Sequence, residues 1–287
     1  NFAVQMQLSL NIRDQLIDLS SPVVMAIVNI TPDSFYTSWG NKDEDDLLNQ
    51  IQEFVDQGAD IIDIGACSTR PNSTPVDTTE EWNRLAPALK SIRRHFPKVI
   101  ISVDTFRAEI AEKAILAGAD IINDVYGGDA DDKMWEIVAK YHVPYILTCA
   151  RELPKDSKGY NYTMSHIVDF FQEQLDKLHR MGLADVIIDP GFGFGKTEEQ
   201  NYTILRQLEV LSILRVPILV GISRKSMLYK PLEKSPSDVL AATIAANTIA
   251  LEHGASILRV HDVVAAQQAN AIHIQTHKQT ESYVTRN

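Results

Sequence analysis

The chain has 287 residues, 45% of them hydrophobic, and a formal net charge of −11. The negative charge argues against non-specific binding to nucleic acid, and no apolar stretch approaches the roughly 18 residues that a membrane span needs. Because its two cysteines, Cys67 and Cys149, give neither a disulfide framework nor the spacing of a metal finger, we expect a cytoplasmic enzyme without nucleic-acid or membrane partners.

Eight apolar, β-branched runs punctuate the chain, and helical patterns lie between them. Nearly every run stops at a polar or charged residue. The runs and the residues that follow them are 27–28 before Asn29, 61–62 before Asp63, 101–103 before Asp104, 121–122 before Asn123, 146–147 before Thr148, 187–188 before Asp189, 218–220 before Gly221, and 257–258 before Arg259. Strands that alternate with helices favour parallel pairing. Eight such units predict a closed (β/α)8 barrel, a fold of about 250 residues with its active site at the carboxyl ends of the strands.

The segments around the runs fit this architecture. Leu8, Leu10 and Ile12 alternate as in a short strand, which predicts an N-terminal hairpin that closes the barrel floor. Apolar residues recur at helical spacing between the runs, and Thr78 begins a sequence that resembles a helix cap. No linker or change of composition divides the chain, so residues 1–287 are expected to form one domain.

Three of the polar strand ends are candidates for one binding site. Asp104, Asn123 and Asp189 end the third, fourth and sixth runs, and residues at the ends of nearby barrel strands converge over the mouth. Two carboxylates and an amide beside Lys225 suit a flat, nitrogen-rich heterocycle, because a carboxylate can accept two N–H bonds side by side. The alternative is that these residues cap the helices that follow them. Asp63 is expected to be structural.

The last run carries a cation and an imidazole. Arg259 and His261 are two residues apart, so on an extended segment both point to the same face. Together with Asn29 they could hold phosphate oxygens and a divalent ion. The alternative is an Arg–Asp pair inside the barrel and a histidine that caps a helix.

Two cations follow the seventh run, where barrels often bind phosphate. Of these, Lys225 is expected in the pocket, and Arg224 is expected to face solvent or a carboxylate of a neighbouring helix.

A glycine-rich segment, residues 191–197, follows the sixth run. It is not a P-loop, because Pro190 stands where that motif needs its first glycine, and the dinucleotide-binding spacing fails too. What remains is a tight loop that lets the backbone, or the ring of Phe192, approach a flat ligand.

Seven segments in order resemble the signatures of the dihydropteroate synthases. The segments are Asn29-Ile30-Thr31-Pro32-Asp33-Ser34-Phe35, Asp63-Ile64-Gly65 with Ser68-Thr69-Arg70-Pro71, Ser102-Val103-Asp104-Thr105, Ile122-Asn123-Asp124-Val125, residues 189–197, Ser223-Arg224-Lys225-Ser226, and Arg259-Val260-His261-Asp262-Val263. The resemblance runs from about Val24 to about Ile272, and seven motifs in order are very specific.

The resemblance implies a pterin-binding (β/α)8 barrel that makes dihydropteroate for folate biosynthesis. Such a transferase condenses 4-aminobenzoate with the diphosphate of hydroxymethyl-dihydropterin, and sulfonamides compete for the aminobenzoate site. The resemblance also implies Mg2+ as a cofactor and a homodimer formed through late helices.

Carried over by position, the resemblance assigns roles to single residues. The pterin would be held by Asp104, Asn123, Asp189 and Lys225, the diphosphate by Thr69, Arg259 and His261, and Mg2+ by Asn29. The aminobenzoate site would be formed by Asp33, Phe35, Arg70, Pro71, Phe192 and Ser226. Charge on the departing diphosphate would be stabilised by Arg259, His261 and Mg2+, and Asp33 could stabilise the cation left on the pterin methylene.

The chain departs from the family pattern after the fifth run. Cys149-Ala150-Arg151-Glu152 stands where the family has a His-Met pair and a glycine. This departure motivates one alternative, a catalytically impaired paralogue that binds pterin without turnover. A pterin-dependent methyltransferase is a second alternative, although such domains lack the Thr-Pro-Asp-Ser-Phe and Ser-Arg-Lys-Ser loops found here.

Overall fold

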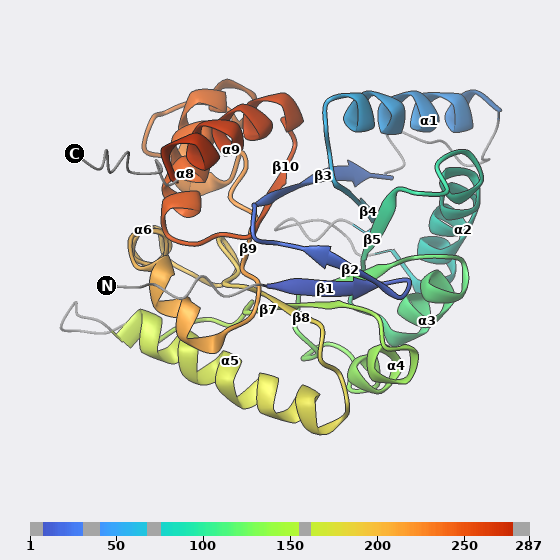
Figure 1. The fold of residues 1–287 in the computed structure, drawn as a ribbon, viewed down its shortest axis with the longest axis horizontal. Coiled ribbons are helices and arrows are strands. Elements are labelled where there is room, and N and C mark those ends of the chain that lie inside the picture. Colours follow the sequence, from blue (N-terminus) through green and yellow to red (C-terminus); the bar gives the residue numbers. More distant parts are fainter. Residues whose placement is uncertain (1–7, 31–40, 68–75, 155–161, 278–287) are drawn as a thin grey trace, which may run out of the picture.

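The computed structural model describes residues 8–30, 41–67, 76–154 and 162–277, and Figure 1 shows its strands enclosed by helices. The eight strands of the main sheet all pair in parallel. They are β3 (Val23–Asn29), β4 (Ile61–Gly65), β5 (Ile100–Asp104), β6 (Ile121–Asp124), β7 (Tyr145–Thr148), β8 (Val186–Asp189), β9 (Leu219–Val220) and β10 (Ile257–Val260). Their order is β8-β7-β6-β5-β4-β3-β10-β9, and one parallel bridge between Ile188 and Ile218 joins its two ends. The sheet is therefore a nearly closed barrel, which confirms the predicted fold.

Helices alternate with these strands and lie around the outside of the barrel (Figure 1). They are α1 (Asn41–Asp56), α2 (Thr78–His95), α3 (Ala108–Leu116), α4 (Met134–Tyr141), α5 (Tyr162–Arg180), α6 (Glu198–Arg206), the short α7 (Ser226–Tyr229), α8 (Leu240–Glu252) and α9 (Val263–His277). Two 3-10 segments, η1 (Leu208–Leu214) and η2 (Pro236–Asp238), complete the described elements. The cap of α2 lies one residue earlier than predicted, because the side chain of Asp77 accepts the N–H of Glu80 at 2.8 Å and Thr78 is already helical.

Alternation along the strands separates two cores. Side chains that point outward, such as Val24, Ile62 and Val103, pack against the helices in the main core. Side chains that point inward at the strand starts form a second cluster at the floor of the barrel. Its buried strand members are Met25, Ile61, Ile121, Ile146, Ile187, Leu219 and Ile257. This two-residue period puts one face of every strand inside the barrel.

An N-terminal hairpin closes the floor, as predicted. Strands β1 (Ser9–Ile12) and β2 (Gln15–Asp18) pair antiparallel, and both residues of their turn, Arg13 and Asp14, have positive φ angles of 50° and 60°. Two consecutive positive φ angles match the tight turns whose twist suits a hairpin. The hairpin side chains Leu10 and Ile12 are buried against the floor cluster.

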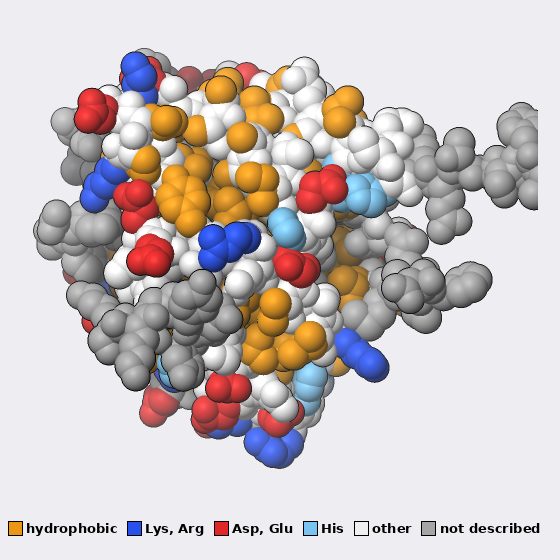
Figure 2. Space-filling view, turned by 90° about the vertical axis from the view of Figure 1, so that its left-hand side faces the viewer, with side chains coloured by type: hydrophobic (Ala, Val, Ile, Leu, Met, Phe, Trp, Pro, Cys, Tyr) orange, Lys and Arg blue, Asp and Glu red, His pale blue; other side chains and the backbone are white. Residues whose placement is uncertain are grey.

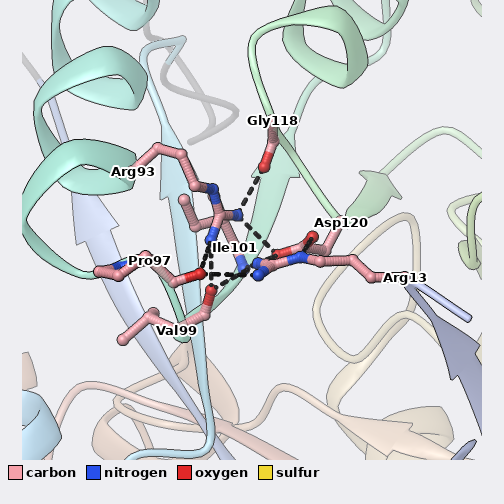
Figure 3. Close-up of polar contacts among 7 residues, drawn as sticks. All are labelled: Arg13, Arg93, Pro97, Val99, Ile101, Gly118 and Asp120. Atoms are coloured by element: carbon pink, nitrogen blue, oxygen red, sulfur yellow. Dashed lines mark hydrogen bonds and ion pairs between the residues drawn. The ribbon is translucent and has the colours of Figure 1, made fainter. Parts of the chain in front are cut away.

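A buried carboxylate fixes this hairpin to the barrel (Figure 3). Asp120 accepts both Nε and Nη2 of Arg13 at 2.6 Å, Nη2 of Arg93 at 2.8 Å and the backbone N–H of Ile101 at 2.8 Å. Arg13 also donates to the carbonyl of Val99 at 2.9 Å. We call this group the floor network; it joins the hairpin turn, the last turn of α2 and two neighbouring strands.

No helix in the described part of the chain is both long and apolar enough to cross a membrane.

Candidate active site at the barrel mouth

The inward-facing side chains become polar two residues after the floor cluster along each strand. Among these eight positions, seven are polar or glycine; the exception is Ile27. The seven, which we call the polar layer, are Asp63, Ser102, Asn123, Thr148, Asp189, Gly221 and Arg259. The polar residues that sequence reasoning placed at separate strand ends therefore face one another inside the barrel.

Arg259 is the centre of this layer. Its Nε donates to Oδ2 of Asp63 at 2.7 Å, and its Nη2 donates to Oδ2 of Asp104 at 2.8 Å. Asn123 donates its side-chain amide to the same Asp63 oxygen at 3.1 Å. The Arg–Asp pairing considered for Arg259 is thus present, and it connects four of the polar groups in one hydrogen-bonded set.

Asp63 was expected to be structural, and its contacts fit that expectation. It is fully buried and accepts hydrogen bonds from Arg259 and Asn123, a connection that sequence reasoning did not predict. In the sequence Asp63 ends the second apolar run, and in the structure it lies in the middle of β4. Its inward direction follows from the spacing, since Asp63 is two residues after the inward-facing Ile61.

Three buried oxygens of the polar layer have no hydrogen-bond partner among the described residues. They are Oδ1 of Asp63, Oγ of Ser102 and Oγ1 of Thr148. Buried polar atoms in folded proteins are almost always paired with protein or with ordered water. A set of unpaired oxygens in one layer therefore leaves hydrogen-bonding capacity for a polar ligand or for water.

Strands β5 and β6 end in the polar residues predicted for the site. Asp104 and Asn123 are register partners on β5 and β6, and both are buried. The next residue, Asp124, accepts the backbone N–H of Gly128 at 2.7 Å and the hydroxyl of Tyr145 at 2.8 Å. These bonds fix the loop directly after Asn123 and so hold its amide in place.

Burial changes the protonation of Asp104. Loss of hydration raises the pKa of Asp104 to about 7, against the attraction of Arg259, and the negative charge of Asp63 adds to the rise. Two carboxylates that share one guanidinium therefore leave Asp104 on the border between its charged and neutral forms near neutral pH.

A second charged pair lies across the mouth. Asp189 is buried and accepts the N–H of Gly191 at 2.8 Å, and burial raises its pKa against the attraction of Lys225. Lys225 donates its Nζ to the carbonyl of Phe192 and lies 4.5 Å above the ring of Phe194. Burial lowers the pKa of Lys225 to about 8, against the attraction of Asp189.

The glycine-rich segment brings its backbone, and not the Phe192 ring, to this pair. The ring of Phe192 is completely buried in the main core, whereas its carbonyl accepts the Nζ of Lys225. Gly191 has a φ of 72°, and a Cβ there would lie 2.2 Å from the carbonyl oxygen of Cys149. Only glycine allows this close approach. Sequence reasoning identified the tight loop but not the direction of its aromatic side chain.

The segment after β9 separates its two cations as predicted. Arg224 donates from Nε and Nη2 to the two carboxylate oxygens of Asp262, at 2.9 and 2.6 Å, and Lys225 turns into the mouth. His261 lies beside Ser223, with 3.0 Å between Nδ1 and Oγ. Ser226, the first residue of α7, is half-buried.

Asn29, the predicted metal ligand, is exposed at the end of β3. Five residues predicted for the site lie outside the described residues: Asp33, Phe35, Thr69, Arg70 and Pro71.

Comparison with known proteins shows the family to which this chain belongs. A sequence profile described as pterin binding enzyme matches residues 25–261. A dihydropteroate synthase from Clostridium beijerinckii is 39% identical over 249 residues, which cover 86% of this chain and 91% of that protein. The chain belongs to the dihydropteroate synthase family.

Solved structures of the dihydropteroate synthase family have the same fold. The Xanthomonas albilineans enzyme with 4-aminobenzoic acid is 32% identical, with a TM-score of 0.85, and the match covers 96% of this chain and all of that one. The Clostridium difficile enzyme in the presence of pteroic acid is 35% identical, with a TM-score of 0.83, and covers 90% of this chain and 98% of that one. These relatives support synthase activity and not the methyltransferase considered from the sequence.

The loop after β7, where this chain departs from the dihydropteroate synthase pattern, is tied to both neighbouring loops. Arg151 donates from Nε and Nη2 to both carboxylate oxygens of Asp129, each at 2.7 Å, and stacks on Phe170. Lys196 donates its Nζ to the carbonyl of Cys149 at 2.6 Å. Arg151, one of the replaced residues, thus ties the loop to Asp129 through its side chain, while the bond from Lys196 goes to the backbone of Cys149. We call these two contacts the β7 latch.

Proposed function

We propose that this protein condenses 4-aminobenzoate with (7,8-dihydropterin-6-yl)methyl diphosphate to form 7,8-dihydropteroate and diphosphate in folate biosynthesis. The observation that carries this proposal is the convergence of Asp104, Asn123, Asp189 and Lys225 on one barrel mouth. A family whose solved members hold 4-aminobenzoic acid or pteroic acid supports the choice of substrates.

The polar groups at the mouth suit the edge of a pterin ring. Carboxylates of Asp104 and Asp189 accept N–H groups of the ring, and the Nζ of Lys225 donates to a ring acceptor. The unpaired Oδ1 of Asp63, in the polar layer, receives a further donor or an ordered water. Buried hydrogen-bonding groups reject ligands that lack the matching partner, which makes this layer a specificity device.

In the reaction the C–O bond between the pterin methylene and diphosphate breaks, and a C–N bond to the aminobenzoate nitrogen forms. Diphosphate leaves with the electron pair, and the amine loses one proton to solvent. Arg259 and His261, on the inward face of β10 and just beyond it, are placed to stabilise the growing negative charge. The neutral amine is a weak nucleophile, so the protein contributes mainly by positioning the two substrates.

Asn29 fits a Mg2+ ion at the diphosphate end. Its amide is exposed at the end of β3, and Mg2+ usually takes one or two protein oxygens, several waters and substrate phosphate oxygens. The bound ion would offset charge on the departing diphosphate. Thr69 belongs to the same diphosphate site by position in the family motif.

The aminobenzoate site is proposed at the rim of the mouth. By motif position it includes Asp33, Phe35, Arg70 and Pro71 together with Ser226, which begins α7 above Lys225. Sulfonamides resemble 4-aminobenzoate in shape and compete there. By motif position Phe192 also belongs to this site, although its ring is buried.

A homodimer through α8 and α9 is proposed from their exposed apolar side chains. Leu240, Ile249, Val264 and Ile272 are between 40% and 65% exposed. Figure 2 looks onto this side of the molecule and shows hydrophobic side chains gathered in patches. Contiguous apolar surface of this kind marks association sites.

The test is product formation. Purified protein is incubated with both substrates and Mg2+, and diphosphate and dihydropteroate are measured together. Equal amounts of the two products are expected, and their formation should stop in Asp189→Asn. Binding of the pterin diphosphate without turnover, measured by calorimetry, would instead identify the impaired paralogue considered from the sequence.

A further inference from the structure

A group of potential metal ligands lies at the ends of the last two helices. Glu252 is the final residue of α8, and His273 and His277 occupy the last two turns of α9. Residues four apart on a helix project from the same face, so both imidazoles face α8. Because helices of this fold run back from the mouth, the group lies near the floor, away from the polar layer.

The ligand atoms are already close together. Nδ1 of His273 is 2.9 Å from Oε1 of Glu252, and Nε2 of His277 is 3.6 Å from Oε2 of the same carboxylate. One ligand atom from each residue lies within 4.8 Å of the other two. A tetrahedral Zn2+ ion with bonds of about 2.0–2.2 Å holds its ligand atoms roughly 3.3–3.6 Å apart. Small side-chain rotations therefore suffice to complete the geometry.

An independent contact orients one of the imidazoles. Nδ1 of His277 is 2.9 Å from the backbone carbonyl of His273 and 3.1 Å from Oγ1 of Thr276. A hydrogen on Nδ1 that is donated to a carbonyl leaves the lone pair on Nε2, which faces Glu252. Metal-binding histidines usually donate their second ring nitrogen to an oxygen in this way.

We propose that Glu252, His273 and His277 form a binding site for a divalent transition-metal ion of the Zn2+ type. Two imidazole nitrogens and one carboxylate oxygen suit Zn2+, Co2+ or Ni2+, whereas Mg2+ and Ca2+ prefer oxygen ligands. In the single chain the side chains of Glu252 and His277, at the last residues of α8 and α9, are 48% and 53% exposed, so an ion and its remaining water ligand have access there. The bound ion joins α8 to α9 and replaces the hydrogen bond between His273 and Glu252.

The site is tested by calorimetric titration of the untagged full-length protein with Zn2+ in the presence of saturating Mg2+. One Zn2+ ion per chain is expected, with affinity that falls at least tenfold in His277→Ala and in Glu252→Gln. Circular dichroism confirms that each variant is folded.

His253→Ala is the matched control. His253 is next to Glu252 in sequence but pairs with Glu209, 2.5 Å away, so this variant should bind Zn2+ like the parent. Co2+ bound at the site should give the visible absorption of a tetrahedral ion, and His277→Ala should abolish it.

Absence of Zn2+ binding would overturn the proposal. So would an affinity unchanged in both ligand variants, or one lost equally in His253→Ala. The Zn2+ titration does not measure dihydropteroate formation. If the protein forms no dihydropteroate, the result of the Zn2+ titration still stands.

Discussion

The floor and the mouth of this barrel both contain arginine–aspartate ion pairs, but the ratio of arginine to aspartate differs. At the floor two arginines, Arg13 and Arg93, share the single carboxylate of Asp120. At the mouth the single guanidinium of Arg259 is shared by two carboxylates, Asp63 and Asp104. The floor network therefore pairs two cations with one anion, and the Arg259 group pairs one cation with two carboxylates.

The two regions also differ in how completely their polar atoms are paired. Both oxygens of Asp120 accept hydrogen bonds from arginine, and one of them also accepts a backbone N–H. Within the described part of the chain, Oδ1 of Asp63 is buried without a partner. A satisfied network stabilises the fold, whereas an unsatisfied one leaves bonding capacity for a ligand.

The largest expected effect is a loss of turnover, without a loss of stability, when a residue of the mouth is replaced. Lys225→Ala should lower kcat for dihydropteroate formation by about 100- to 1,000-fold, the usual loss when one preorganised donor is removed from an active site. The midpoint of urea unfolding should change little. Lys230→Ala, an exposed lysine five residues later, is the control and should keep normal turnover. Normal turnover in Lys225→Ala would remove this residue from the site.

A substitution in the floor network should lower stability and leave turnover unchanged. Asp120→Asn should lower the free energy of unfolding by about 3 kcal/mol, the low end for a broken buried ion pair, because Arg13 is partly exposed. Urea unfolding followed by fluorescence measures the change. Turnover of the folded fraction at low temperature should stay near the parent value, and a large loss there would show that the two regions are coupled.

A pH profile tests the charge balance of the mouth. With a pKa of about 7, Asp104 becomes an acceptor carboxylate only as pH rises, and with a pKa of about 8, Lys225 loses its proton above that value. The profile of kcat/KM should therefore be a narrow bell that falls about tenfold per pH unit outside pH 7 to 8. Asp104→Asn should lose the acid limb, and retention of that limb would assign it to another group.

The raised pKa of Asp104 also makes the free energy of unfolding depend on pH. The pKa of Asp104 is raised from 3.8, so between pH 4 and pH 7 the folded protein binds more protons than the unfolded chain. Its contribution to stability is present below pH 4 and is lost as pH rises through about 7.

The smallest effect is expected at the β7 latch. Arg151→Ala removes the bidentate contact with Asp129 but no group that touches substrate. This ion pair is about half exposed, and an exposed pair contributes only about 0.2–1 kcal/mol. We therefore predict that KM for the pterin substrate rises roughly threefold. KM for aminobenzoate and kcat should be unchanged. Steady-state kinetics in both substrates distinguishes this result from a general loss of folding.

The sequence predicted the barrel, the hairpin and the convergence of polar groups because all three follow from short-range periodicity. Asp104, Asn123 and Asp189 were found since each ends an apolar run. Asp63 also ends such a run, but its contacts with Arg259 and Asn123 join separate strands and could not be predicted from one strand alone.

Tertiary packing decided what periodicity could not. Nothing local distinguishes a Phe192 ring that faces the mouth from one that faces the core; its direction depends on the main core cluster that surrounds it. Likewise, the pairing of Arg259 with Asp63 joins residues 196 positions apart. Chain spacing carries no information about such a contact.

The double pairing of Arg259 has a consequence for affinity. If Asp104 accepts the pterin and Arg259 receives diphosphate, substrate binding is an exchange in which existing ion pairs open as new ones form. The measured binding free energy is then the difference between two sets of contacts, so it is much smaller than the sum of the new ones. The same exchange run backwards lets Arg259 return to its two carboxylates and displace the diphosphate product, which links release of product to recovery of the starting site.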